Sequence, residues 1–181
     1  MNITETNLVG LLLIEPKVFK DSRGYFLESY NSETFKNSGI DVNFVQDNQS
    51  FSCKGTLRGL HFQNTPYAQV KLVRVITGSI IDVAVDIRKG SKTYGKYYSA
   101  ELSGENKKML YIPDGFAHGF LTLEDNTIVQ YKCSNVYNKE SEGGIMWNDP
   151  DININWGLID EPIISDKDKN NISFKDLNSK F

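Results

Sequence analysis

Hydrophobic residues along most of this chain recur in short segments that are typical of β-strands. Between Ile80 and Ile87, apolar side chains occupy positions 81, 83, 85 and 87, while Asp82 and Asp86 fall on the opposite face. This alternation has the period of an extended strand, whose successive side chains point to opposite sides. The pattern therefore predicts a strand over Ile80–Ile87 with two distinct faces.

Similar segments follow one another along the chain, and turn residues separate them roughly every eight to twelve positions. Further predicted strands are Val9–Ile14, Tyr25–Tyr30, Val42–Gln46, Leu57–Phe62, Val70–Ile76, Tyr94–Leu102, Lys108–Ile112, Gly119–Leu123 and Thr127–Cys133. Short helices are expected only at Ser32–Asn37 and, in the polar tail, at Ser173–Leu177. Regularly spaced short strands predict an all-β sandwich or barrel.

The composition is that of one globular domain. The chain has 181 residues, of which 39% are hydrophobic and 24% charged, so it can bury a proper core. No repeat or linker interrupts it, and we expect a single domain over residues 1–181. A net charge of −3 argues against a broad nucleic-acid interface. No apolar segment is long enough to span a membrane.

The cysteines and the N-terminus point to a cytoplasmic protein. Cys53 and Cys133 are the only cysteines, and their wide spacing gives neither a disulfide framework nor a C-x-x-C motif. The N-terminal residues lack the charged and apolar regions of a secretory signal. A reducing cytoplasm is therefore the expected location.

The segment Arg58–Gln63 holds the first candidate for chemistry. It contains His61, one of only two histidines, between Arg58 and Lys71 in an apolar region rich in β-forming residues. Such a histidine can act as a general base, and neighbouring cations can bind an anion or stabilise a developing oxyanion. A lone histidine is more often a structural residue, so the assignment depends on what else faces the same space.

Strand parity places two further candidates on apolar faces. Lys71 shares its face with residues 73 and 75, and Tyr131 shares its face with residues 129 and 133. Both side chains should therefore point into the barrel, although Lys71 could extend to the rim and Tyr131 could be a core aromatic. With His61 they would supply a base, an enolate stabiliser and a proton donor for transfer at a carbon beside a carbonyl. Spacing alone does not identify a carboxylate behind His61.

A metal site is the main alternative for a small barrel. Pro113–His118 is similar to the second half of the cupin signature, whose first half would need His-x-His. Here the equivalent place reads His61-Phe62-Gln63, and two histidines in all cannot form a three-histidine site. A site with two histidines and one carboxylate lacks a well-spaced acid. We therefore expect a cupin-like barrel with no metal.

Motifs of one enzyme family occur in order along nearly the whole chain. They are Glu15–Phe19, Asp21–Phe26, Glu28–Asn31, Phe44–Asn48, Leu57–Gln63, Lys71–Arg74, Asp82–Arg88, Ile112–Phe120, Tyr131-Lys132, Ser141–Gly143, Trp147–Asp149 and Ser165–Asp168. On these residues the sequence resembles the dTDP-4-dehydrorhamnose 3,5-epimerases.

The resemblance implies a double-stranded β-helix, or jelly roll, with short peripheral helices. It also implies an isomerase that needs no cofactor and works as a homodimer. The substrate would be dTDP-4-dehydro-6-deoxy-D-glucose, a dTDP-4-keto-6-deoxy-hexose. Inversion at C3 and C5 would give dTDP-4-dehydro-β-L-rhamnose, in the formation of dTDP-L-rhamnose.

The resemblance also assigns roles by position. It implies that His61 is the base and is paired with Asp168, that Lys71 stabilises the enolate, and that Tyr131 is the acid on the opposite face. Substrate-binding residues would be Arg23, Glu28, Gln46, Asn48, Arg58, His118, Glu142 and Lys167, with Tyr137 stacking on thymine. Arginine and lysine suit a diphosphate, and an aromatic face suits a base.

Several of these residues also have structural explanations. Arg23 could cap a turn, Glu142 could be a solvated loop acid, and His118 could be structural. Asp168 lies in a polar tail, where a surface carboxylate is the usual case. Asp82 and Asp86 could pair with neighbouring basic side chains.

The chain departs from the family pattern near the predicted pocket. Val70 stands where relatives often have glycine, and the loop Asn64–Tyr67 differs. These departures leave open a monofunctional C3- or C5-epimerase acting on a related dTDP-4-keto-6-deoxy sugar. A sugar-binding barrel without catalysis and a metal-dependent oxygenase are the alternatives from other classes.

Overall fold

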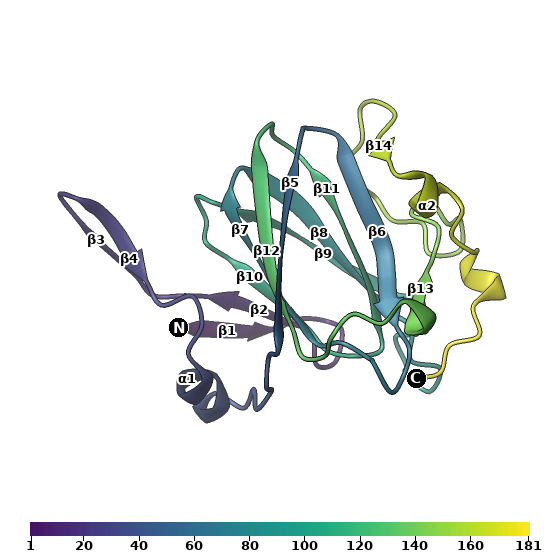
Figure 1. Cartoon of the computed structure of the whole chain (residues 1–181), viewed down its shortest axis with the longest axis horizontal. Helices are drawn as coiled ribbons and strands as arrows, with labels where there is room; N and C mark the ends of the chain where they lie inside the picture. The colour runs from purple at the N-terminus through teal and green to yellow at the C-terminus, as the bar shows by residue number, and fades with distance from the viewer.

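Two largely antiparallel sheets face each other in the computed structural model, which describes residues 1–181 (Figure 1). The first sheet has the order β1 (Asn2–Glu5), β2 (Leu12–Glu15), β10 (Met109–Ile112), β7 (Lys71–Thr77), β12 (Thr127–Cys133) and β5 (Gln46–Ser52). The second has the order β13 (Glu142–Gly144), β6 (Thr56–Gln63), β11 (Phe116–Thr122), β8 (Ser79–Asp86) and β9 (Tyr97–Ser103). The short strand β14 (Ile163–Ile164) pairs in parallel with β6.

The main core fills the space between the sheets. Val73 and Val129 of the first sheet pack there with Ile80 and Ala84 of the second. Because Asp82 lies between Ile80 and Ala84 in an alternating strand, its side chain also faces the interior. The polar face predicted for this strand is therefore the face that looks into the barrel.

The opposite face of β8 is buried under the C-terminal third of the chain. Val83, Val85 and Ile87 pack there with Ile152 and Trp156. This segment includes the short helices η1 (Lys139–Ser141), α2 (Asp166–Lys169) and η2 (Phe174–Asp176), which lie outside the second sheet (Figure 1). Both faces of β8 are thus buried, which fits its nearly continuous burial.

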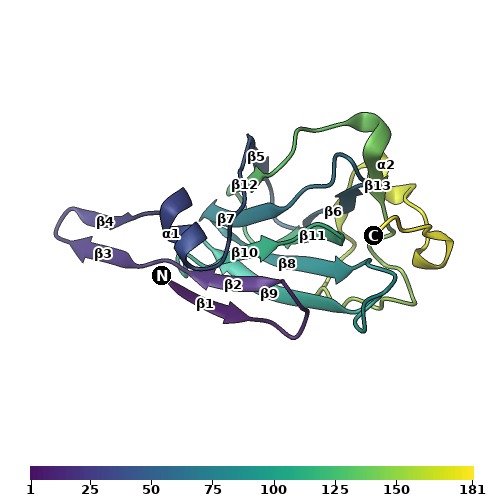
Figure 2. The same ribbon diagram turned by 90° about the horizontal axis from the view of Figure 1, so that it is seen from below.

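A separate hairpin projects from the other end of the molecule (Figure 2). It consists of β3 (Val18–Asp21) and β4 (Gly24–Leu27), which pair only with each other. Phe26 is 69% exposed on this hairpin, and Phe19 and Tyr25 are also exposed. Helix α1 (Ser32–Asn37) follows, and the Asn31 side chain caps it by accepting from Glu33 N–H and Thr34 N–H.

The all-β class, the short peripheral helices and most of the predicted strands are confirmed, with ends shifted by a few residues. The predicted strand Val42–Gln46 is wrong, because residues 41–45 are irregular and the strand runs over Gln46–Ser52 instead. Val9–Ile14 is a strand only from Leu12, since Gly10 has a φ of +88° in the preceding turn. The predicted helix at Ser173–Leu177 is a single 3₁₀ turn.

None of the helices is long and apolar enough to cross a membrane.

Candidate active site

A cavity of about 870 Å³ opens between the two sheets. Strands β5, β7 and β12 line it from one side, β6 and β11 line it from the other, and α2 contributes from the C-terminal segment. The predicted site residues that line it are Gln46, Asn48, Arg58, His61, Lys71, His118, Tyr131, Tyr137, Glu142, Lys167 and Asp168. Residues that are far apart in the sequence thus meet in one polar pocket.

His61 and Asp168 form a close pair at the side of β6. His61 Nε2 lies 2.6 Å from Asp168 Oδ1, with side-chain exposures of 31% and 4%. Burial acts to raise the pKa of Asp168, but the hydrogen bonds from His61 and from the Gly59 N–H outweigh it, so the net pKa is lowered. Asp168 is therefore a buried carboxylate held against the imidazole of His61.

Gly59 makes the position of Asp168 possible. The pairing of β6 with β11 shifts register at this point, and Gly59 has a φ of +123°. A Cβ atom here would lie 2.5 Å from Gly119 Cα, so only glycine fits. The Gly59 N–H donates to Asp168 Oδ2 at 3.1 Å. This role of Gly59 was not predicted, although a glycine inside a strand pattern is a known signal of a bulge.

A second histidine–aspartate pair lies deeper in the same cavity. His118 Nε2 is 2.7 Å from Asp82 Oδ1, and the side chains are only 5% and 0% exposed. Burial lowers the pKa of His118 in spite of the nearby Asp82 charge. The sequence alone leaves a structural role open for both residues. The structure shows that Asp82 supports His118 from the neighbouring strand.

Lys71 and Tyr131 reach the cavity from the opposite sheet, as strand parity predicted. Lys71 is 9% exposed, and its Nζ lies 6.0 Å from the centre of the Tyr131 ring. Burial lowers the pKa of Lys71, and the nearby carboxylates of Asp82 and Glu142 offset this only in part. Burial also raises the pKa of Tyr131, so its phenol stays protonated and can donate.

The outer part of the cavity carries charged and aromatic groups. The Tyr137 hydroxyl donates to Glu142 Oε2 at 3.1 Å, and Lys167 pairs with the other oxygen of the same carboxylate. Burial acts to raise the pKa of Glu142, but these two partners lower it overall. Arg58 is held by Ser52 Oγ and by the carbonyl of Phe51.

Gln46 and Asn48 lie on the edge strand β5. The Gln46 amide donates to Asn48 Oδ1 at 3.0 Å and accepts from the Tyr137 N–H at 2.9 Å. Asn48 also donates to the Cys133 sulfur at 3.5 Å. Both residues therefore line the cavity while stabilising the segment that carries Tyr137.

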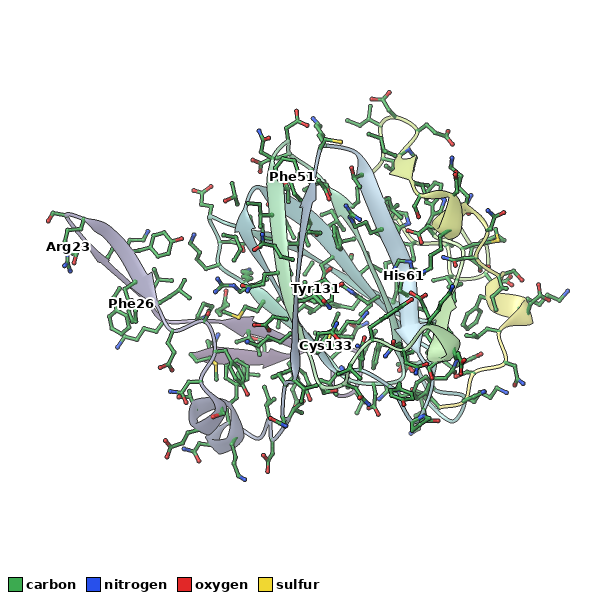
Figure 3. The ribbon with its side chains drawn as sticks, viewed as in Figure 1. Arg23, Phe26, Phe51, His61, Tyr131 and Cys133 are labelled. Carbon is green, nitrogen blue, oxygen red and sulfur yellow. The ribbon has the colours of Figure 1, made fainter.

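Two predicted residues, Arg23 and Glu28, do not line this cavity. Arg23 lies on the projecting hairpin, 2.6 Å from Asp21 Oδ2, and its side chain is 87% exposed. Glu28 accepts from Asn31 Nδ2 at 3.0 Å. Figure 3 shows Arg23 at the end of the hairpin, away from His61 and Tyr131. Within a single chain, these residues stay outside the pocket.

No group of three or more His, Cys, Asp or Glu side chains is arranged to hold a metal ion. His61 and His118 each bond to a carboxylate instead. The Gln63 side chain, at the place where a cupin metal ligand would stand, bonds to backbone groups.

Comparison with known proteins decides the family. The family model for dTDP-4-dehydrorhamnose 3,5-epimerase matches residues 5–176. The chain belongs to this family. The dTDP-4-dehydrorhamnose 3,5-epimerase of Methanothermobacter thermautotrophicus is 54% identical over 168 residues, which are 92% of this chain and 90% of the relative.

Solved structures of the family agree over almost the whole chain. The Legionella pneumophila 3,5-epimerase in complex with dTDP-4-keto-L-rhamnose superposes with a TM-score of 0.94 at 44% identity, covering 98% of this chain and 94% of that one. A 3'-monoepimerase from Streptomyces bikiniensis, in complex with dTDP-quinovose, gives 0.88 at 32% identity, with coverages of 93% and 85%. The predicted jelly roll and the predicted enzyme class, an isomerase, are confirmed.

Proposed function

We propose that this enzyme converts dTDP-4-dehydro-6-deoxy-D-glucose to dTDP-4-dehydro-β-L-rhamnose by inverting C3 and C5. The observation that carries the proposal is the placement of His61 and Tyr131 on opposite sheets around one cavity. A base and an acid on opposite sides of a bound sugar can remove a proton from one face and return one to the other. Lys71 lies on the same side as Tyr131.

The proposed mechanism uses the C4 ketone twice. Both C3 and C5 are next to this carbonyl, so loss of a proton from either carbon leaves an enolate with its charge on the C4 oxygen. His61 takes the proton, and Asp168 stabilises the imidazolium that forms. The Lys71 ammonium, which is 9% exposed, stabilises the enolate oxygen. Tyr131 then protonates the carbon from the opposite face. Proton exchange with solvent returns the imidazole and the phenol to their starting forms before the second carbon is inverted, and no cofactor is needed.

The binding residues divide by chemistry. We propose that Arg58 and Lys167 bind the diphosphate, because both cations lie at the outer part of the cavity. Tyr137, whose ring is exposed, stacks on thymine. Gln46, Asn48, His118 and Glu142 supply further polar contacts to the nucleotide sugar.

The deciding experiment follows solvent deuterium by NMR while the enzyme acts on dTDP-4-dehydro-6-deoxy-D-glucose in deuterated water. We expect deuterium at both C3 and C5. Deuterium at one carbon only would select a monofunctional epimerase, the activity of the 3'-monoepimerase that is 32% identical. Binding of the substrate without exchange at either carbon would mean that the barrel binds sugars but does not catalyse the reaction.

We further propose a homodimer in which the hairpin reaches the partner's pocket. The exposed aromatic residues of the hairpin form an apolar surface that a partner subunit would bury. Arg23 and Glu28 lie outside the pocket of their own chain. A mixture of His61→Asn and Arg23→Ala variants should recover activity, because a mixed dimer contains one intact site. Lys20→Ala, also on the hairpin, is the control and should be active alone. A monomeric enzyme would show no recovery.

A cytoplasmic location is also proposed. Cys53 and Cys133 are both free thiols, which fits a reducing compartment.

A further inference from the structure

Gln63 is a buried amide whose hydrogen bonds all go to connecting segments. It lies at the end of β6 and is 5% exposed. Its Nε2 donates to the Tyr67 carbonyl at 2.6 Å and to the Val136 carbonyl at 3.2 Å. Its Oε1 accepts from the Asn138 N–H at 2.7 Å. Both ends of the amide are therefore satisfied by backbone groups.

Two of these backbone groups flank a single residue, Tyr137. The Val136 carbonyl belongs to the peptide group before Tyr137, and the Asn138 N–H belongs to the peptide group after it. The Gln63 amide thus holds the backbone on both sides of Tyr137, as a neighbouring strand would. A third bond, from the Tyr137 N–H to Gln46 Oε1, fixes the peptide from the edge strand.

The Tyr137 side chain has little else to hold it. Tyr137 is 55% exposed, and its one hydrogen bond runs from the hydroxyl to Glu142. Because few side-chain contacts hold the Tyr137 ring, its position depends on the backbone that carries it. The position of this aromatic face is therefore set mainly by the contacts of residues 136–138, in which Gln63 has the central part.

We propose that Gln63 is a positioning residue that fixes Tyr137 for stacking on the pyrimidine base of the nucleotide. The inference rests on the proposed function, which assigns that stacking to Tyr137. Gln63 does not itself touch the reacting carbons in this proposal. It acts on affinity for the nucleoside part of the substrate and leaves proton transfer to His61 and Tyr131.

The chemistry of the site explains why an amide is required. The two carbonyls need N–H donors, the Asn138 N–H needs an acceptor, and a primary amide offers both on one planar group. A glutamate would place a carboxylate against two carbonyl oxygens. An apolar side chain of similar size would leave three partly buried backbone groups without these partners.

The test compares Gln63→Glu with wild-type enzyme. We expect KM for dTDP-4-dehydro-6-deoxy-D-glucose to rise about tenfold, because loss of hydrogen bonds to the backbone releases the stacking residue, while kcat changes by less than about twofold. The Kd of dTDP, from calorimetry, should rise in parallel. The Kd of inorganic pyrophosphate should stay unchanged, because it has no base to stack.

Gln130→Glu is the matched control. Gln130 lies on β12 with its side chain on the face opposite to Tyr131, and the change of charge is the same. It should keep wild-type KM and kcat. If Gln63→Glu does not fold, Gln63→Met replaces it, with the same expected rise in KM and the same comparison of dTDP with pyrophosphate.

A double mutant separates positioning from general damage. In a Tyr137→Ala background, Gln63→Glu should weaken dTDP binding no further. Additive losses, or equal weakening of dTDP and pyrophosphate, would overturn the inference, as would an unchanged KM in an active Gln63→Glu enzyme. A wild-type enzyme that neither binds dTDP nor exchanges protons would instead contradict the proposed function itself.

Discussion

The two histidine–aspartate pairs in the cavity have the same chemical groups and almost the same bond lengths, yet they lie in different surroundings. The separations are 2.6 Å in His61–Asp168 and 2.7 Å in His118–Asp82. The His61 side chain is 31% exposed, whereas that of His118 is 5% exposed. The His61 ring is open to the cavity, while burial lowers the pKa of His118 and favours its neutral form. The two pairs therefore differ in their exposure to the cavity and hardly at all in the geometry of the pairing.

The largest expected effect comes from replacing His61, the proposed general base. His61→Asn should reduce deuterium exchange at C3 and C5 by about 10³-fold, because a positioned general base typically contributes 10²- to 10⁴-fold. NMR in deuterated water measures the exchange, and circular dichroism checks the fold. Exchange at the wild-type rate would show that another group, with His118 the first candidate, is the base.

Tyr131→Phe tests the acid that faces His61 from the other sheet. Net inversion should fall by about 10²-fold, since the donor on the opposite face is lost. Exchange at the original face should persist, because proton removal does not need the phenol. The comparison of product formed with deuterium incorporated measures this. A parallel loss of both would place Tyr131 in proton removal as well.

Asp168→Asn should give a smaller loss, of about 10- to 100-fold in kcat, through the orientation and charge of His61. The asparagine keeps the size of the side chain but cannot stabilise an imidazolium as a carboxylate does. Asp166→Asn is the control in the same helix, where the side chain is 97% exposed. If both variants kept wild-type kcat, the carboxylate behind His61 would have no part in catalysis.

The buried pair His118–Asp82 should make the free energy of unfolding depend on pH. The pKa of His118 is lowered below 6.5, so the unfolded chain binds more protons in weakly acidic solution. This contribution is fully present above pH 6.5 and is lost as pH falls through the lowered value. The slope is at most about 1.4 kcal/mol per pH unit.

Urea unfolding between pH 7.5 and pH 5 measures this slope. His118→Asn should remove it, and His61→Asn should keep it. The reverse result would mean that the exposed pair, rather than the buried one, carries the pH dependence.

The sequence predicted the part of the site that depends on strand periodicity. Lys71 and Tyr131 face the cavity because each follows the alternation of its own strand, which is a local property. Strand β5 could not be found in this way. Gln46–Ser52 has polar residues on both faces, since one face lines the pocket and the other is exposed at a sheet edge.

The partner of His61 depended on contacts between distant parts of the chain. Only the family resemblance pointed to Asp168, because a short polar helix near the C-terminus carries no hydrophobic signal. Its position results from the parallel pairing of β14 with β6 and from the Gly59 N–H. Neither contact follows from local sequence. The hydrogen bonds from Gln63 to residues 136 and 138 could not be predicted for the same reason, because these residues are distant in the sequence.

The segment that carries Tyr137 lies in a connection between strands, whereas His61, Lys71 and Tyr131 lie within the sheets. A protein engineer can therefore randomise the residues around Tyr137 and select for a different nucleoside carrier without redesigning the barrel. The two parts meet at Gln63, which lies at the end of β6 and bonds to residues 136 and 138. In the proposed function, changes in the connection alter which nucleotide is bound, while the strand residues continue to invert the sugar.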